Sequence, residues 1–349
     1  MRKRATMHDV AALAGVSLKT VSRVVNREES VSEALAQRVQ RAVAQLDYRH
    51  NLAASNLRRG QRTSSIGVLL HDLSNSFSAT LLRAIEDRAR SRRIAVFSAS
   101  LDDQVEREPL LAHDLVSRRI DGLVIMPAGG DQSYLQVDIR AGLGVVAVDR
   151  PAHGVDVDTV LADNYGGARA AAFHLATAGH RHMACLTDLD SIWTATERRR
   201  GFVEAVAETG HPLDGRLVVG NISGEQAAEE AVTRLLQRAE PPTALFTGQN
   251  AITVGAIRAL SRLGLQDQVA IVGFDDFPLS DVVRPAVTVI RQDVAAMGGV
   301  VADLLLAQLD GEAAPPQRHV QPNGLIVRGS GEIGPAVGTP VVSRLSPIA

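Results

Sequence analysis

Residues 6–26, TMHDVAALAGVSLKTVSRVVN, decide the fold of the amino-terminal region because they carry the signals of two short helices and a tight turn. Thr6 and Asp9 have the spacing of a variant capping box, which starts a first helix. Gly15 can take a positive φ in the turn without a steric penalty, and Ser17 can cap a second helix. The stretch therefore predicts a helix-turn-helix.

The exposed face of the second helix carries side chains that suit the edges of DNA bases. Leu18, Lys19, Ser22 and Arg23 are expected on the face opposite the inward-pointing valines. Lysine and arginine can donate to guanine O6 and N7, and a leucine can contact the thymine methyl group. Taken alone, the pattern also fits an ordinary helical hairpin with a solvated basic face.

Charge is divided unevenly between this region and the rest of the chain. Residues 1–62 contain 12 Lys and Arg and 5 Asp and Glu. Of the chain totals of 37 and 39, this leaves 25 Lys and Arg and 34 Asp and Glu for the remaining residues. The amino-terminal region is therefore at +7 and the remainder at −9. Only the basic part would be attracted to phosphate. A membrane-surface role would need an apolar face or a lipid anchor, and the sequence shows neither.

A third helix and a short basic segment follow the helix-turn-helix. An apolar stripe predicts a helix that begins after Ser32 and runs to about Leu46. Residues 48–60 then offer Asn51 as a cap for a further short helix, which is too short to be stable alone. We therefore expect a DNA-binding headpiece at 1–49 and a hinge helix with linker at 50–62.

Two motifs, AGVSxxTVSRVVN at residues 14–26 and YxxNxxAxxL at residues 48–57, resemble those of the lactose-repressor and purine-repressor family of bacterial transcription regulators. The resemblance implies a homodimer on a near-palindromic operator of double-stranded DNA, with a tetramer as the alternative assembly. It also implies that the hinge helix enters the minor groove. The residues expected to contact DNA are Thr6, Ser17, Leu18, Lys19, Thr20, Ser22, Arg23, Asn26, Asn51, Ala54, Leu57 and Arg58.

Leu57 is the residue that the family resemblance assigns as a wedge between base steps. A leucine from each of two symmetric subunits would partly unstack and kink the duplex, and extra contacts would offset the unstacking energy. A plain linker leucine is the alternative. His50 stands where the family usually has proline, so we expect a less rigid hinge before DNA binds.

Short apolar runs alternate with amphipathic helices beyond residue 63. The runs are 66–70, 94–99, 122–126, 145–148, 160–162, 183–187, 244–247 and 269–272, and helices are expected near 77–92, 105–118, 133–141, 166–178, 195–209, 224–238, 251–263 and 294–310. Continuous apolar runs are typical of strands covered on both faces, and hence of doubly wound parallel sheets. We expect an α/β effector domain at 63–330, like that of periplasmic binding proteins. It would have two such units, 63–160 and 161–330, joined by crossing connections and followed by a flexible tail at 331–349.

Polar loops follow these runs at the carboxyl ends of the strands, where open α/β sheets bind ligands. Their carboxylates, amides and arginine suit a neutral polyol, because each hydroxyl both donates and accepts, while an aromatic ring covers the apolar sugar face. A small carbohydrate or nucleoside-like effector is therefore expected. The expected effector-binding residues are Asp72, Asn75, Phe77, Asp163, Trp193, Arg198, Ile222, Gln249 and Asp275.

Several of these positions follow the family resemblance. Arg198 in ERRRGF matches the arginine that clamps the effector, and Asp275 in VGFDD matches the aspartate that accepts from it. Ile222 aligns loosely with an aromatic that stacks on ligand in some relatives. Trp193 could supply the missing stacking surface, or it could be a partly buried packing residue. Asn250 stands where aspartate is common, which bears on effector chemistry.

Composition and motifs argue against other classes of protein. The chain is 45% hydrophobic and 22% charged, as in an ordinary globular protein, and no apolar run reaches the length of a membrane span. The single Cys185 excludes an internal disulfide and fits the cytoplasm. We find no metal-binding spacing, cofactor loop or activated nucleophile, so we expect no metal, no cofactor and no enzymatic activity. A sugar-binding transport receptor would share the fold but would need an export signal.

The sequence therefore favours a homodimeric transcription regulator, more often a repressor, that is controlled by a small polar metabolite. A sugar is the favoured effector, and both induction and corepression are compatible with the residues. An enzyme and a transport receptor are the alternatives from other classes.

Overall fold

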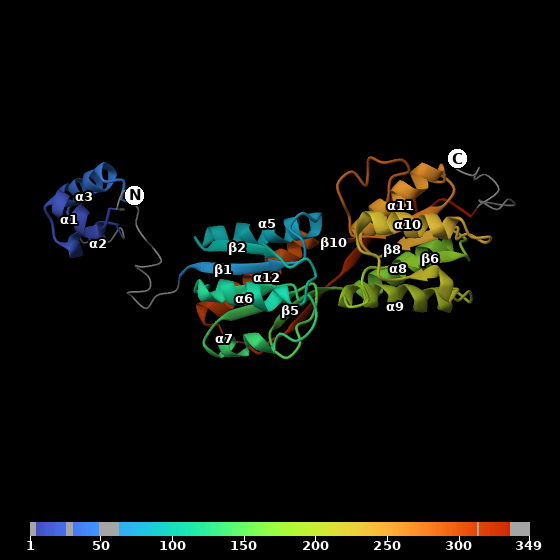
Figure 1. Cartoon of the computed structure of the whole chain (residues 1–349), viewed down its shortest axis with the longest axis horizontal. Helices are drawn as coiled ribbons and strands as arrows, with labels where there is room; N and C mark the ends of the chain where they lie inside the picture. The colour runs from blue at the N-terminus through green and yellow to red at the C-terminus, as the bar shows by residue number, and fades with distance from the viewer. Residues whose placement is uncertain (1–4, 26–30, 49–62, 313, 336–349) are drawn as a thin grey trace. The chain divides into compact units, whose positions relative to one another are not determined.

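The computed structural model describes residues 5–25, 31–48, 63–312 and 314–335 (Figure 1). The chain divides into two compact units, Met1–Thr63 and Ser64–Ala349, which we call the headpiece unit and the effector unit. In the described part of the chain, no helix has the length and apolar character needed to cross a membrane.

The headpiece unit contains three short helices around a small core. These are α1 (Met7–Ala14), α2 (Leu18–Val25) and α3 (Glu33–Gln45). The expected capping box is present, since the Thr6 amide donates to the Asp9 carboxylate at 2.8 Å. Gly15 has a φ of 62° in the turn. Val10 and Val21 are fully buried, which confirms the expected inward face.

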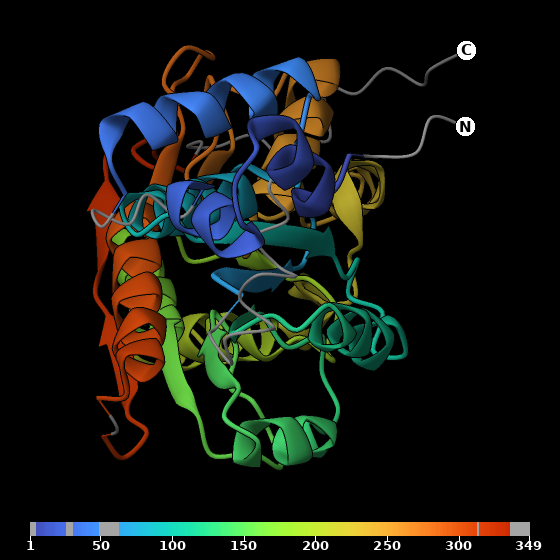
Figure 2. The same cartoon turned by 90° about the vertical axis from the view of Figure 1, so that its left-hand side faces the viewer.

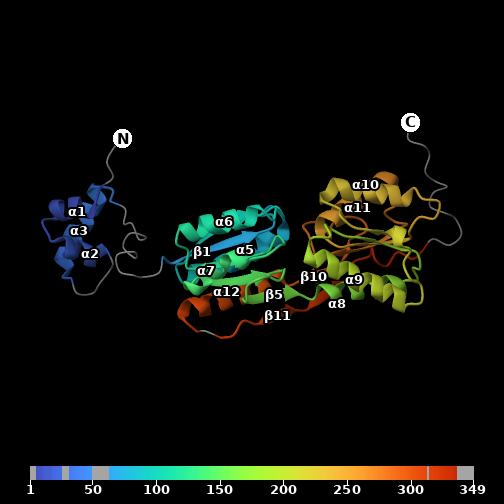
Figure 3. The same ribbon diagram turned by 60° about the horizontal axis from the view of Figure 1, so that its bottom comes forward.

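The effector unit contains two six-stranded sheets, each covered by helices on both faces (Figures 1 and 3). The first sheet has the order β11 (Arg318–Gln321), β5 (Asp158–Ala162), β4 (Gly144–Val148), β3 (Gly122–Ile125), β1 (Ser65–Leu70) and β2 (Ala95–Ser100), with all pairs parallel. Its helices are α5 (Ser76–Ser91), α6 (Arg107–Ser117), α7 (Gln136–Arg140) and α12 (Val294–Asp310). We call this half the first subdomain.

The second subdomain repeats the architecture. Its sheet has the order β12 (Asn323–Ile326), β10 (Thr288–Gln292), β9 (Ala270–Phe274), β8 (Ala244–Thr247), β6 (Met183–Leu186) and β7 (Val218–Val219), and only the β10–β12 pair is antiparallel. Its helices are α8 (Asn164–Thr177), α9 (Trp193–Glu208), α10 (Gly224–Leu236) and α11 (Asn250–Leu263).

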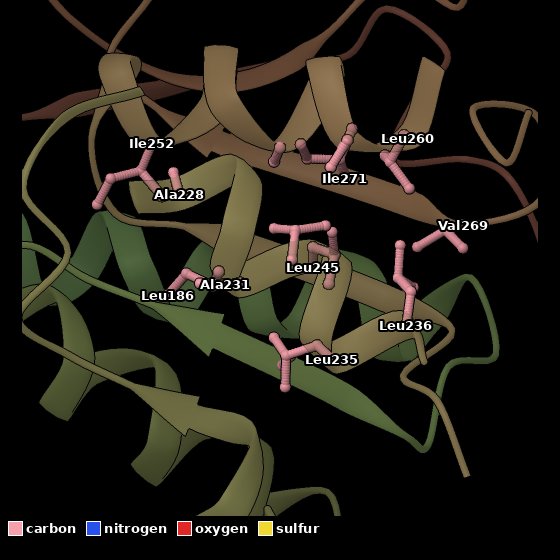
Figure 4. Close-up of a cluster of buried hydrophobic side chains, with 14 of the residues drawn as sticks. Leu186, Ala228, Ala231, Leu235, Leu236, Leu245, Ile252, Leu260, Val269 and Ile271 are labelled. Carbon is pink, nitrogen blue, oxygen red and sulfur yellow. The ribbon is translucent and has the colours of Figure 1, made fainter. Parts of the chain in front are cut away.

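Burial on both faces explains the continuous apolar runs of the strands. In β1, Val68 and Leu70 pack toward α5 and α12, whereas Leu69 packs into the cluster under α6. In the second subdomain, Leu245 and Ile271 of the sheet meet Leu235 and Leu260 of the covering helices (Figure 4). Each such side chain contributes about 1.5–3 kcal/mol through burial. The predicted strands and helices are thus confirmed, with shifts of a few residues at their ends.

Three connections cross between the subdomains, and they correct the expected boundary at 160/161. The chain crosses from β5 to α8, returns from β10 to α12, and crosses again from β11 to β12. Figure 2 shows α12, in orange-red, beside the strands of the first subdomain although it lies late in the sequence. Residues 294–310 and 318–321 therefore belong to the first half rather than the second.

The stretch that begins at Gly331, expected to be a flexible tail, is held by hydrogen bonds in its described part. The Glu332 carboxylate accepts from the Thr288 hydroxyl at 2.9 Å, and His180 Nε2 lies 2.7 Å from the Ile333 carbonyl oxygen. The prediction of a loose stretch is therefore wrong for residues 331–335, because hydrogen bonds hold them on the second subdomain. Residues 336–349 lie outside the described residues.

Candidate functional site

The first turn of α2 exposes the side chains that the sequence assigns to base reading. Leu18 is 37% exposed and Lys19 is exposed beside it, while Arg23 is half-buried one turn later. The Ser17 hydroxyl accepts from the Thr20 amide at 3.1 Å and so caps the helix. Leu18 and Lys19 therefore lie at the capped amino-terminal end of α2, the part of a recognition helix that contacts base edges in a major groove.

The other residues expected at DNA divide into two sets. Thr6 is exposed at the start of α1, and Thr20 and Ser22 are half-buried along α2. The five remaining predictions, Asn26, Asn51, Ala54, Leu57 and Arg58, lie outside the described residues.

A small cavity lies between the carboxyl ends of the two sheets. Five of the nine expected effector residues line it, namely Asn75, Phe77, Arg198, Gln249 and Asp275. Its volume is about 40 Å³. Sites for small ligands are commonly about 300–1,000 Å³. This cavity is therefore smaller than a typical ligand site, but a neighbouring cleft of about 640 Å³ shares Phe77, Asp275 and Gln292 with it.

Arg198 is the centre of the polar network beside this cavity. It is 4% exposed, and its Nη1 lies 3.1 Å from Oδ2 of Asp275, which is 7% exposed. Nε donates to Asn164 Oδ1 at 2.7 Å, and the guanidinium stacks 3.8 Å from the centre of the Phe274 ring. Arg198 and Asp275 therefore contact each other directly. Because the network holds both side chains in place, neither charge is buried without a partner.

Asp275 connects this arginine to one of the crossing connections. Gln292 Nε2 donates to Asp275 Oδ1 at 2.5 Å, and Gln292 is the last residue of β10 before the chain returns to the first subdomain. Asn164, the first residue of α8, follows another crossing. Hydrogen bonds therefore link the cavity to two of the three connections between the subdomains.

An amide pair joins the two walls of the cavity directly. Asn75 Nδ2 donates to Asn250 Oδ1 at 3.1 Å, and Asn250 Nδ2 donates to Asn75 Oδ1 at 3.0 Å. Asn75 belongs to the first subdomain, where it also caps α5, and Asn250 begins α11 of the second. Separation of the walls must break this reciprocal pair.

Four expected effector residues are not among those that line the cavity. The Asp72 carboxylate accepts from Ser74 within its own turn at 2.8 Å, and Asp163 caps α8 by accepting from Gly166. Ile222 is 3% exposed within the core under α10 and α11. The Trp193 ring lies 5.6 Å from the guanidinium of Arg318, a contact that fits the alternative of a packing residue.

Further polar residues that were not expected from the sequence also line the cavity. Asp149 and Arg150 directly follow β4, so the rule applied to the other strand ends would have found them. Arg150 Nη1 donates to Asp103 Oδ1 at 2.6 Å. His71 Nδ1 is in ion-pair contact with Asp103 at 2.8 Å, although without hydrogen-bond geometry.

The electrostatic environment differs between these groups. Burial alone would lower the pKa of His71, but the Asp103 carboxylate outweighs it and the pKa is raised. Burial raises the pKa of Asp149 although Arg150 and Arg198 oppose it. The cavity therefore combines fixed cations with carboxylates and amides that can accept from and donate to hydroxyl groups. Among the described residues, no three His, Cys, Asp or Glu side chains are grouped to hold a metal.

Comparison with known proteins gives two family matches. Residues 6–51 match the lacI family of bacterial regulatory proteins, and residues 172–331 match a periplasmic binding protein-like domain. The chain is 31% identical to the HTH-type transcriptional regulator GalR of Escherichia coli K12, over 93% of this chain and 95% of GalR.

Two solved structures are similar over most of their length. The Lac repressor dimer bound to operator and the anti-inducer ONPF has a TM-score of 0.82 at 26% identity, covering 94% of this chain and 99% of that chain. The complex of the transcriptional regulator CelR with cellobiose has a TM-score of 0.70 at 30% identity, covering 94% of this chain and 100% of that chain.

Proposed function

The chain belongs to the lacI family of bacterial regulatory proteins, and on that premise we propose that it is a homodimeric repressor that releases a near-palindromic operator when a sugar occupies the cavity. As a member of this family it is a DNA-binding transcription regulator and not an enzyme. The operator symmetry, the sugar, the sign of the response and a cytoplasmic location are parts of the proposal.

The buried pair of Arg198 and Asp275 is the observation that carries the effector proposal. Both groups are desolvated and fixed before any ligand arrives, so they can bind a hydroxyl with little reorganisation. Asn75, Asn250 and Gln249 add amide groups that both donate and accept. Phe77 offers an apolar face for a sugar ring. The cellobiose bound by the similar CelR structure also favours a carbohydrate.

The proposed DNA contacts divide between the headpiece and the hinge. Leu18, Lys19 and Arg23 would read base edges in the major groove. Asn51, Ala54, Leu57 and Arg58 would form the hinge segment, with Leu57 as the wedge in the minor groove. Two headpieces in one homodimer would bind two half-sites, and pairing of dimers into a tetramer is the alternative assembly.

Regulation would follow from linkage between the cavity and the subdomain arrangement. A ligand that separates Asn75 from Asn250 changes the relative position of the walls, and the contacts through Gln292 and Asn164 transmit that change to the crossing connections. A coupling free energy of about 1–3 kcal/mol would change operator affinity roughly 5- to 150-fold.

Selection of bound duplexes from a pool of random DNA sequences tests the DNA-binding half of the proposal. We expect the intact chain to enrich a near-palindromic sequence with two half-sites. Enrichment of an asymmetric sequence would contradict the homodimeric arrangement, and a pool without any enriched sequence would contradict sequence-specific regulation.

A further inference from the structure

Two arginine pairs lie near the start of β1, at the end of the first sheet where the chain enters the effector unit. The sequence Ser-Arg-Arg-Ile occurs twice, at residues 91–94 after α5 and at residues 117–120 after α6. The strands that follow, β2 and β3, are the two neighbours of β1. Figure 1 shows both helix ends at the edge where β1 begins. The arginine rim, as we name it, consists of Arg92, Arg93, Arg118 and Arg119, all of them exposed.

Two residues of the arginine rim adopt a backbone conformation that favours glycine. Arg93 has a φ of 58° and Arg119 a φ of 60°. The corresponding residues after α7, α8 and α9 are Gly142, Gly179 and Gly210. A side chain with a Cβ is disfavoured at this position of a helix end. Like Asp47 after α3, the two arginines stand where the backbone favours glycine, so backbone preference does not select them.

The arginine rim is also locally cationic on an acidic unit. Arg92 pairs with Asp310 at 2.5 Å, and the Asp121 carboxylate accepts from the Ser65 amide at 3.2 Å. Within residues 63–312 and 314–335, Arg93 and Arg118 have no ion-pair partner, whereas Arg119 has an interaction partner of its own. Residues 63–349 carry a net charge of −9, so phosphate would repel this unit as a whole. The arginine rim places positive charge at the end of the sheet where β1 begins, next to the connection to the headpiece.

We propose that the arginine rim binds the phosphate backbone of the duplex that the headpiece holds. A guanidinium can bind a phosphate through two parallel hydrogen bonds, and its charge is permanent. This inference rests on DNA binding by the proposed headpiece, from which the chain enters the effector unit at Ser64, just before β1. Contacts of this kind add affinity and orient the effector unit without reading sequence.

Operator binding by an Arg93→Gly/Arg119→Gly double variant tests the proposal, with the selected duplex as the probe and full-length protein at several salt concentrations. Glycine suits both positions, so we expect the melting temperature of the effector unit to stay the same or to rise. Operator affinity at low salt should fall about tenfold or more. The slope of log affinity against log salt should become shallower by about 0.9 for each phosphate that the variant no longer neutralises.

Two matched variants separate charge from other effects. Arg93→Lys/Arg119→Lys keeps both charges and should retain most of the affinity and the salt slope. Arg181→Gly removes an exposed arginine before β6, in the second sheet, and should change neither. If the double glycine variant binds the operator with unchanged affinity and salt slope, the arginine rim does not contact DNA. Failure of the wild type to bind any duplex would instead contradict the proposed function.

Discussion

The headpiece and the cavity of the effector unit place their functional side chains in opposite ways. In the headpiece, the proposed base-reading residues come from one turn and a half of a single exposed helix. In the cavity, Arg198 and Asp275 are more than ninety per cent buried and come from elements far apart in the sequence. A polyanion can be met by exposed charges that adapt to it. A neutral polyol needs polar groups that are fixed and desolvated in advance.

The largest loss of stability should follow the removal of a buried charge from the cavity. Arg198→Ala leaves the Asp275 carboxylate buried without its ion-pair partner, so we expect the effector unit to lose about 3–5 kcal/mol of unfolding free energy. The response to a sugar should disappear, while the headpiece still binds DNA. Chemical denaturation and operator titration measure the two effects.

Arg258→Ala is the matched control for that variant. Arg258 pairs with Glu225 at 2.7 Å between exposed side chains, and such pairs contribute about 0–1 kcal/mol. Equal losses in the two variants would show that burial does not distinguish the cavity pair. A sugar response that survives in Arg198→Ala would remove Arg198 from the effector site.

Removing buried side-chain volume from the headpiece core should weaken DNA binding and leave the effector unit unchanged. Val21 is fully buried, and Val21→Ala should lower the stability of this small unit by about 2 kcal/mol. We expect DNA binding to weaken while sugar binding and the melting of the effector unit stay unchanged. Leu13→Ala, at a side chain that is 46% exposed, is the control and should have little effect. A simultaneous loss of effector-unit stability would contradict the independence of the two units.

The smallest expected effect concerns a buried histidine of the second subdomain. Burial lowers the pKa of His180 from its usual value near 6.5, although the Ile333 carbonyl opposes this. The unfolded chain therefore binds the proton more readily than the folded chain. The stabilisation from neutral His180 is complete above pH 6.5 and is lost as pH falls toward the folded pKa, by at most about 1.4 kcal/mol per pH unit.

Denaturation of the wild type and His180→Gln between pH 7.5 and 5 measures this contribution. We expect the stability advantage of the wild type to shrink as pH falls. Protonation at low pH removes the stabilisation from neutral His180, which His180→Gln lacks at every pH. An advantage that grows toward low pH would reverse the sign and contradict the account of His180 as a neutral buried group.

The elements that could be predicted from the sequence are those with strong local signals. The capping box at Thr6, the turn at Gly15 and the central strands buried on both faces all follow from residues close together in the chain. The strands β7, β10, β11 and β12 were not predicted. They are short or carry polar residues such as those of Arg318–Gln321, and their pairing depends on segments that return from distant parts of the sequence.

The cavity was predicted only in part, because a loop position does not specify where a side chain points. Trp193 was expected at the ligand, but Thr194, Ala195 and Arg198 share the cavity-facing side of α9 and Trp193 does not. Residues three and four positions apart lie on one side of a helix. Counting back from Arg198 would have selected Thr194 and Ala195. Gln292 has no comparable local signal, because its role depends on the crossing after β10.

The most direct test of the account measures operator affinity with and without a sugar that binds the intact chain. Calorimetry with a panel of mono- and disaccharides identifies such a ligand, and anisotropy of a labelled operator then gives the two affinities. We predict that saturating sugar lowers operator affinity roughly 5- to 150-fold and that Arg198→Ala removes this change. A sugar that occupies the cavity yet leaves operator affinity unchanged would contradict the proposal that the cavity controls the headpiece.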